Sequence, residues 1–253
     1  MKIVRFEFKN EILYGVLQND VARVISSPFE SDPVYLGISV PLSEIKLLAP
    51  SAPSKIVAAG LNYRAHTKEL SEKEPSEPLF FIKPSTSVIA PFDDVPIYKS
   101  AGRTDYEAEL AVVIKKECRN VSPDKIGEYI LGYTVLNDVT ARVLQKKDGQ
   151  WTRAKGFDGY CPLGPVIETE LDTKSLKITA KKDGVTVQHG TTADMIWDAA
   201  TLVSFASGIM TLLPGDIVST GTPPGIGEAR DGETVEITVS GIGTLKNTYR
   251  SKD

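Results

Sequence analysis

The chain has 253 residues, 41% of them hydrophobic and 25% charged, which is the composition of a globular protein with a large buried core. A formal net charge of −4 and a pI of about 5.4 exclude the basic excess that draws proteins to nucleic acid or to anionic membranes. No apolar stretch reaches the roughly 18 residues that a membrane span needs, and the N-terminus lacks the apolar block of a signal peptide.

The N-terminal part of the sequence predicts a small β domain. Three segments have the pattern of strands, namely residues 3–8, 12–17 and 21–25. Prolines then punctuate residues 49–54, and proline interrupts both helices and β ladders. We therefore expect an N-terminal β domain over residues 1–52 and a second domain over residues 53–253.

The second domain begins with a strand and a short helical segment. Residues 55–60 predict a buried strand, after which Asn62 is positioned to cap a brief helix that carries His66 and Glu69. Residues 71–78 are charged and rich in proline without an apolar anchor, so we expect a mobile surface loop there.

Most of the remaining chain predicts β structure, which makes the expected fold α+β and mainly β. The predicted strands are residues 79–82, 107–114, 129–136 and 217–220, with hairpins over 176–187 and 234–249. The first hairpin is expected to turn at Asp183-Gly184, a dipeptide that favours tight turns.

One long amphipathic helix interrupts this β pattern. Its apolar residues recur at helical spacing from about Met195 to Leu213, which indicates a deeply packed face. Thr192 or Asp194 is the expected N-cap, and Pro214-Gly215 is the expected stop.

A pair of glutamates on one predicted strand is a candidate metal site. Glu107 and Glu109 are two residues apart, so both carboxylates point to the same face of the strand. Their neighbours are apolar, and two buried like charges require a neutralising cation. Asp138 ends the next apolar strand and offers a third oxygen to magnesium or manganese. The alternative is an exposed edge strand whose glutamates face water.

A histidine and a carboxylate in the short predicted helix form a second candidate. His66 and Glu69 are three residues apart, which places them within reach of each other on one helix face. A carboxylate that is hydrogen-bonded to an imidazole fixes the tautomer of the imidazole and makes the imidazole a stronger base. The alternative is a surface histidine beside a charged loop.

A lysine and a glycine-rich loop offer further polar groups. Lys155 lies among aromatic and glycine residues, where it could pair with a substrate carboxylate or an enolate oxygen, or simply face solvent. The loop over residues 221–225 offers backbone N–H groups to an anion but has no P-loop signature. Cys118 and Cys161 stand outside any paired motif, so we expect reduced thiols in the cytoplasm rather than a disulfide.

The order of these segments resembles the fumarylacetoacetate hydrolase superfamily over residues of about 55–250. The six matching blocks are Gly60-Leu61-Asn62-Tyr63-Arg64-Ala65-His66, Phe81-Ile82-Lys83-Pro84-Ser85, Asp105-Tyr106-Glu107-Ala108-Glu109-Leu110, Asn137-Asp138-Val139-Thr140-Ala141-Arg142, Lys155-Gly156-Phe157-Asp158 and Thr220-Gly221-Thr222-Pro223-Pro224-Gly225-Ile226-Gly227. The sequence departs from the family pattern at two places. It has Gln188-His189-Gly190 where many relatives carry an acidic residue, and Gly159 where a threonine is common.

The resemblance implies a catalytic domain of mixed β-sandwich or β-roll fold that works as a homodimer. It implies Mg²⁺ or Mn²⁺ held by Glu107, Glu109 and Asp138, together with a catalytic dyad of His66 and Glu69 on a lid. It also implies that Lys155 is the active-site lysine and that four further residues lie near the metal and the substrate, namely Arg142, Gln145, Gly221 and Thr222.

The implied activity is magnesium-dependent cleavage of a carbon–carbon bond in a small 2-oxo or diketo acid. An acylpyruvate would be hydrolysed by water that His66 and Glu69 activate, whereas an oxaloacetate-like acid would lose carbon dioxide. Two alternatives stay open. One is an isomerase of 2-hydroxyhepta-2,4-diene-1,7-dioate-like acids in aromatic catabolism, and the other is a non-catalytic module that binds a metal or an acid.

Overall fold

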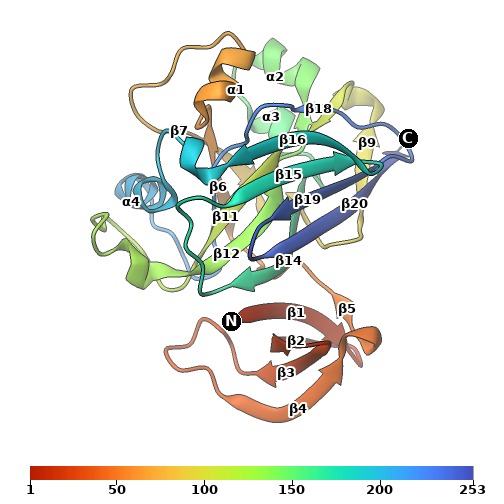
Figure 1. Ribbon diagram of the computed structural model, residues 1–253, viewed down its shortest axis with the longest axis vertical. Coiled ribbons are helices and arrows are strands. Elements are labelled where there is room, and N and C mark those ends of the chain that lie inside the picture. Colours follow the sequence, from red (N-terminus) through yellow and green to blue (C-terminus); the bar gives the residue numbers. More distant parts are fainter. Residues whose placement is uncertain (253) are drawn as a thin grey trace.

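The computed structural model describes residues 1–252, and strands dominate this part of the chain, as the sequence predicts (Figure 1). Its largest sheet has twelve strands within the described residues, and its main path runs β4-β3-β2-β1-β14-β12-β11-β17-β6-β7. No helix in the described residues is long and apolar enough to cross a membrane.

The N-terminal strands form a lobe at one end of the molecule (Figure 1). They are β1 (Lys2–Phe8), β2 (Glu11–Gln18), β3 (Val21–Ile25), β4 (Tyr35–Pro41) and β5 (Lys46–Leu47). The turn between β1 and β2 has φ angles of 52° at Lys9 and 65° at Asn10, which is the left-handed conformation of a tight hairpin. The sequence prediction missed β4, because this edge strand lies mostly exposed and has no alternating pattern of burial.

The lobe continues into the central part of the large sheet because β1 pairs with β14. This part consists of β6 (Lys55–Gly60), β7 (Leu79–Pro84), β11 (Ala108–Ile114), β12 (Ile130–Asn137), β14 (Cys161–Glu168) and β17 (Ile217–Ser219), with the short β8 (Val88–Ile89) alongside β14. Every residue of β11 is buried, since its apolar side chains pack into cores on both faces.

A second sheet packs against β11, β12 and β14 and encloses the largest core. Its strand order is β16-β15-β19-β20-β9, and its members are β9 (Asp94–Tyr98), β15 (Lys177–Lys182), β16 (Val185–Thr191), β19 (Thr234–Val239) and β20 (Gly243–Lys252). The predicted Asp183-Gly184 turn joins β15 to β16 with positive φ angles at both residues. A small third sheet joins β10 (Thr104–Tyr106), β13 (Thr140–Ala141) and β18 (Gly227–Glu228).

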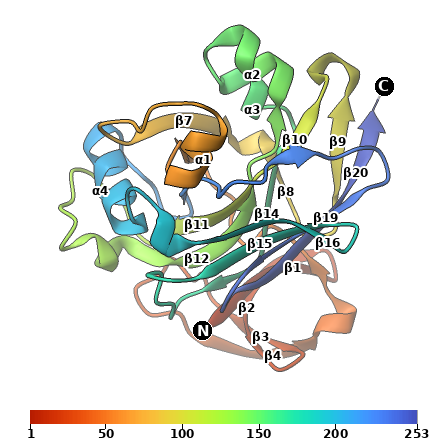
Figure 2. The same cartoon turned by 45° about the horizontal axis from the view of Figure 1, so that its top comes forward.

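Three short helices lie at the end of the molecule away from the N-terminal lobe (Figure 2). They are α1 (Arg64–Glu69), α2 (Arg142–Asp148) and α3 (Thr152–Lys155). Single 3₁₀ turns occur at Leu42–Glu44, Ser85–Ser87, Lys99–Ala101, Ile126–Tyr129 and Thr192–Asp194.

The one longer helix, α4 (Ala199–Ile209), is shorter than the sequence pattern predicts. Its cap is Asp198, which accepts a 2.8 Å hydrogen bond from the Thr201 N–H, so the prediction of Thr192 or Asp194 as cap is wrong. The predicted stop at Pro214-Gly215 is also wrong, because Met210 is already extended and Leu212 forms a β-bridge with Cys118. The apolar periodicity continued past the true end because Leu212 also packs in the core beneath the helix.

Candidate active site

The carboxylates of Glu107, Glu109 and Asp138 come together, and one ligand oxygen from each lies within 4.8 Å of the others. Glu107 immediately precedes β11 and Glu109 lies within it, while Asp138 follows β12, the antiparallel neighbour of β11. Ala108 pairs with Asn137 in this ladder, which sets Asp138 beside the two glutamates. All three side chains are buried, so the alternative of an exposed edge strand is excluded.

Buried cations hold two of the three carboxylates. The Nζ of Lys155 lies 2.8 Å from Oε2 of Glu107 and 2.5 Å from Oδ2 of Asp138, and Lys83 donates to Oδ1 of Asp138 at 2.6 Å. Arg142 donates to Oε1 of Glu107. Both lysines are almost fully buried, so Lys155 is not the solvated lysine of the alternative prediction.

These ion pairs shift the titration of both partners. Burial raises the pKa of the Glu107 carboxyl, but the charges of Lys155 and Arg142 outweigh it and hold that pKa well below its usual range. Burial lowers the pKa of Lys155, but Asp138 and Glu107 outweigh it and raise the pKa. At neutral pH Lys155 is therefore an ammonium group with two of its three donors used and one left for a ligand.

Glu109 differs from its two neighbours because no cation in the described residues forms an ion pair with it. Oε2 of Glu109 accepts hydrogen bonds from the Ser219 hydroxyl and, at 3.0 Å, from the Gly221 N–H. Burial and the negative charge of Asp138 raise the pKa of Glu109 well above its usual range. The three carboxylates offer clustered oxygens, and Glu109 has no cationic partner among the described residues. Such a group of oxygens fits a hard divalent cation such as Mg²⁺ or Mn²⁺.

The predicted dyad is formed. Nδ1 of His66 lies 2.9 Å from Oε2 of Glu69 on α1, and Oε1 of Glu69 accepts a 3.0 Å hydrogen bond from the Gly225 N–H. The imidazole is buried and lines the cavity beside the carboxylates, unlike a surface histidine. Because Glu69 engages Nδ1, the other ring nitrogen, Nε2, remains to exchange a proton.

Asn62 does not cap α1, contrary to the prediction. Its amide instead donates to the carbonyls of Trp197 (2.9 Å) and Thr220 (2.8 Å), and its carbonyl accepts from the Trp197 N–H. The N-cap is Tyr63, which makes no capping hydrogen bond through its side chain. Asn62 therefore ties the chain just before α1 to the segments around Trp197 and Thr220, because tertiary partners for a buried amide outweigh the local cap.

Arg142 and Gln145 lie one helical turn apart at the start of α2. Arg142 donates to Oδ2 of Asp105 at 2.9 Å and to Oε1 of Gln145 at 2.5 Å, in addition to its bond with Glu107. Both residues line the cavity, so the structure places them beside the carboxylates as the family resemblance implies.

The backbone of the glycine-rich loop donates hydrogen bonds to carboxylates of the protein itself. Gly221 and Gly225 donate their N–H groups to Glu109 and Glu69, so these donors hold side chains instead of a free anion. The Thr222 hydroxyl lines the cavity but accepts from Gln188 at 2.9 Å and donates to the Ala108 carbonyl at 3.0 Å. Substrate contacts of Gly221 and Thr222 therefore remain predictions.

Four supporting residues were not assigned a role from the sequence. They are Lys83, Asp105, Gln188 and Ser219, which hold Asp138, Arg142, Thr222 and Glu109. Each is a polar residue in an apolar or strand-like segment and is fully buried. This conflict between residue type and expected burial is the signal that could have identified them.

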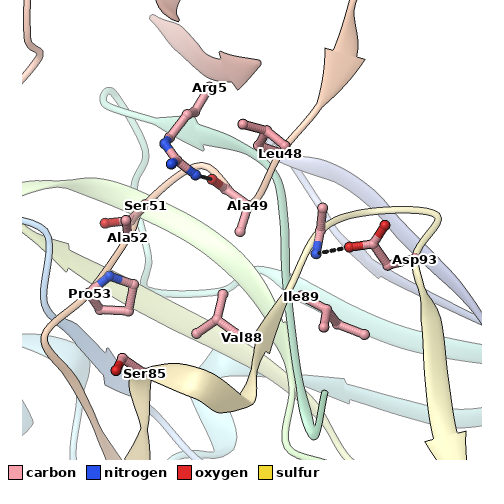
Figure 3. A pocket seen from close by; sticks show the side chains of 11 residues that line it. Arg5, Leu48, Ala49, Ser51, Ala52, Pro53, Ser85, Val88, Ile89 and Asp93 are labelled. Atoms are coloured by element: carbon pink, nitrogen blue, oxygen red, sulfur yellow. Dashed lines mark hydrogen bonds between the residues drawn. The ribbon is translucent and has the colours of Figure 1, made fainter. Parts of the chain in front are cut away.

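A cavity of about 670 Å³ lies beside the carboxylates and the His66–Glu69 pair. Its lining includes His66 and Glu69 from α1, the three carboxylates, Lys155, and an apolar side that contains Phe81 and Trp151. A smaller cavity of about 330 Å³ lies elsewhere, between the N-terminal lobe and the catalytic domain (Figure 3). Arg5 points into that region and donates to the Ala49 carbonyl at 3.3 Å, and the two cavities share no lining residue.

In this mixed β fold, buried carboxylates, a buried lysine and a histidine–glutamate pair surround one cavity. This combination is typical of enzymes that bind small acids. The family model described as fumarylacetoacetate (FAA) hydrolase C-terminal matches residues 55–250, and the model Rv2993c-like, N-terminal, matches residues 1–50. The chain belongs to the fumarylacetoacetate hydrolase family, as its sequence motifs indicated.

Solved structures and a curated relative agree with this assignment. The 5-carboxymethyl-2-hydroxymuconate delta-isomerase of Mycobacterium smegmatis is 41% identical, with a TM-score of 0.94 and 100% of both chains covered. The 2-hydroxyhepta-2,4-diene-1,7-dioate isomerase of Mycobacterium marinum is 40% identical, with a TM-score of 0.93 and coverage of 100% of this chain and 99% of that one. The mitochondrial oxaloacetate tautomerase Fahd2a of Rattus norvegicus is 36% identical over 82% of this chain and 70% of its own.

Proposed function

We propose that this protein is a metal-dependent enzyme that moves a proton between carbon and oxygen of a 2-oxo acid, interconverting keto and enol tautomers. The observation that carries the proposal is the buried His66–Glu69 pair, which lines the same cavity as the three carboxylates and Lys155. The similar proteins named tautomerase and isomerase support the same class of reaction.

The metal would be held by Glu107, Glu109 and Asp138, whose oxygens are clustered and whose charge is only partly compensated. A Mg²⁺ or Mn²⁺ ion bound there would supply Lewis-acid stabilisation of negative charge on the substrate oxygens.

The chain's own groups account for the proton transfers. Nε2 of His66 takes a proton from the carbon next to the keto group, while Glu69 stabilises the imidazolium that forms. The electron pair moves to the keto oxygen, where the remaining N–H of Lys155 donates a hydrogen bond to the developing negative charge. The imidazolium of His66 then gives its proton to that oxygen, which completes the enol and restores the neutral imidazole, and the reverse sequence restores the keto acid.

A direct test follows the fate of the substrate carbon. The purified protein, incubated with oxaloacetate and Mg²⁺ in deuterated water, is expected to accelerate both enol–keto conversion and deuterium uptake at the carbon next to the keto group. The rate should fall after chelation of the metal and by about 10²–10⁴-fold in His66→Ala. Metal-dependent stabilisation without conversion of any 2-oxo acid would contradict the proposal and favour a non-catalytic binding module.

Carbon–carbon cleavage is the second candidate, since the same histidine can activate water and the cavity has room for one beside an acid. Release of pyruvate from acylpyruvates or from oxaloacetate, measured with a coupled lactate dehydrogenase assay, would identify a hydrolase or a decarboxylase. Deuterium exchange without pyruvate release would leave tautomerisation alone.

A further inference from the structure

One side of the main cavity is apolar and has no part in the proposed proton transfers. Phe81 and Trp151 line it, and Leu70 and Leu79 stand at its rim with 36% and 41% of their surface exposed. None of these side chains exchanges a proton at neutral pH, and the indole N–H of Trp151 is the one hydrogen-bond donor among them. Their contribution to a reaction in this cavity is therefore the fit of the ligand.

The position of Trp151 is fixed by its packing. Its ring meets the edge of Phe81 with 5.3 Å between ring centroids and an angle of 72° between the planes. On another side it lies against the backbone of Gly60, where an added Cβ would come within 2.4 Å of Cζ3 of the indole. Only glycine at position 60 leaves the space that the indole occupies.

This apolar side is continuous with the reacting end of the cavity. The Nζ of Lys155, which bonds to Glu107 and Asp138, also lies 5.1 Å from the centroid of the Phe81 ring. Because Phe81 lies near Lys155 and contacts Trp151, a ligand held at the carboxylates can extend along Phe81 to Trp151.

The size of the cavity exceeds the need of a four-carbon acid. At about 670 Å³ it falls within the range of roughly 300–1,000 Å³ that holds drug-sized ligands. With a ligand as short as oxaloacetate at the carboxylates, the Phe81–Trp151 side would remain in contact with water.

We propose that Phe81 and Trp151 form a subsite for a planar, unsaturated chain that extends beyond the fourth carbon of the substrate, and that Trp151 determines chain specificity. A conjugated chain offers a flat face to the aromatic rings and loses less rotational freedom on binding than a saturated one. The inference rests on the proposed function, because it takes the 2-oxo acid end to be held beside the carboxylates.

The first test compares two substrates that differ in length. Trp151→Ala is expected to lower kcat/KM for 2-hydroxyhepta-2,4-diene-1,7-dioate by about tenfold or more, and to change that for oxaloacetate by less than about threefold. Gly60→Ala, which displaces the indole without removing it, should show the same selective loss. Trp197→Phe, at the only other tryptophan of the sequence, is the matched aromatic control.

The second test measures binding without turnover. In Trp197→Phe, Trp151 is the only remaining indole, and its fluorescence should be quenched by the seven-carbon acid with Mg²⁺ but much less by oxaloacetate. Equal losses for both substrates in Trp151→Ala, or no quenching of Trp151 by the longer acid, would overturn the subsite.

These outcomes separate the two proposals. If the wild type converts oxaloacetate but Trp151→Ala shows no preference for chain length, the subsite fails and the proposed function stands. If neither acid is converted but the seven-carbon acid still quenches Trp151 selectively, the proposed function fails and the apolar subsite stands.

Discussion

The carboxylate cluster and helix α1, which we propose to act as a lid, line the same cavity but are built in opposite ways. The carboxylates lie on or beside adjoining strands of the large sheet, and buried lysines, Arg142 and backbone groups hold their oxygens. In contrast, α1 has six residues, no side-chain cap and an exposed loop after it. Glu69 is bonded to the rest of the domain through the Gly225 N–H.

This difference suggests a division of labour. The charges of Glu107 and Asp138, which would be costly to bury alone, are fixed in a frame that already supplies their cationic partners. His66, the proposed base, lies on a short element without a side-chain cap, and we expect this element to move when a ligand enters. Changes in the frame should therefore alter both stability and activity, whereas changes in the lid should alter activity alone.

The largest effect on activity is expected from Glu109→Gln in the frame. The amide keeps the size of the side chain but removes the uncompensated charge, so metal affinity should collapse and activity should fall by about 10³-fold. The metal-free protein should be as stable as the wild type or more stable, because burial and Asp138 disfavour the ionised carboxyl. Thermal unfolding with and without Mg²⁺ measures both effects, and an unchanged Mg²⁺ response would contradict the assigned ligand.

Lys155→Met should have the opposite effect on the metal-free protein. It leaves Glu107 and Asp138 buried with one cation fewer, and removing one partner of a buried ion pair costs about 3–5 kcal/mol. Added Mg²⁺ should recover part of this loss, so the stabilisation by Mg²⁺ should exceed that of the wild type. Denaturant unfolding gives the free energies, and Lys147→Met, at an exposed lysine of α2 that does not line the cavity, is the matched control.

Glu69→Gln tests the lid without disturbing the frame. The amide can still accept from Gly225 but no longer stabilises a protonated His66, so kcat should fall by about tenfold or more. The free energy of unfolding should change by less than about 0.5 kcal/mol. A large loss of stability would show that α1 belongs to the frame.

The smallest effect concerns acid stability of the frame at Asp216, away from the cavity. Burial raises the pKa of this carboxyl, but hydrogen bonds from Leu213, Lys55 and Ser54 outweigh it and lower the pKa. Because the folded pKa lies below the unfolded value of about 3.9, this stabilisation is present above that pH and is lost as the pH falls through the folded pKa.

Asp216→Asn should therefore remove about 1–2 kcal/mol at neutral pH and flatten the dependence of stability on pH below about 4. Unfolding curves at neutral pH and at pH values below 4 measure this difference. A wild-type slope retained in Asp216→Asn would assign the acid sensitivity to other carboxylates.

The sequence was most informative where a local pattern needs no distant partner. The alternation in residues 3–8 and 12–17 and the Asp183-Gly184 turn predicted their strands and hairpin, since twist and φ preference act within a few residues. The spacing of His66 and Glu69 predicted their contact for the same reason.

It was least informative where tertiary contacts outweigh local preference. Asn62 is a residue type that commonly caps helices, but its side-chain amide donates hydrogen bonds to two carbonyls from elsewhere in the chain. The apolar period around α4 continues beyond Ile209, because the extended chain after the helix is buried in the same core.

By itself the sequence determined the β-rich class of the protein, its family and the set of groups that meet in the cavity, because strand alternation and motif order are written in consecutive residues. Only the tertiary structure decided how the charges are shared among them. Glu107 and Asp138 receive buried lysines while Glu109 receives only neutral donors, and this follows from ladder register and from residues as distant in the chain as Lys83 and Ser219. Electrostatic balance depends on distance in space, which no local pattern specifies.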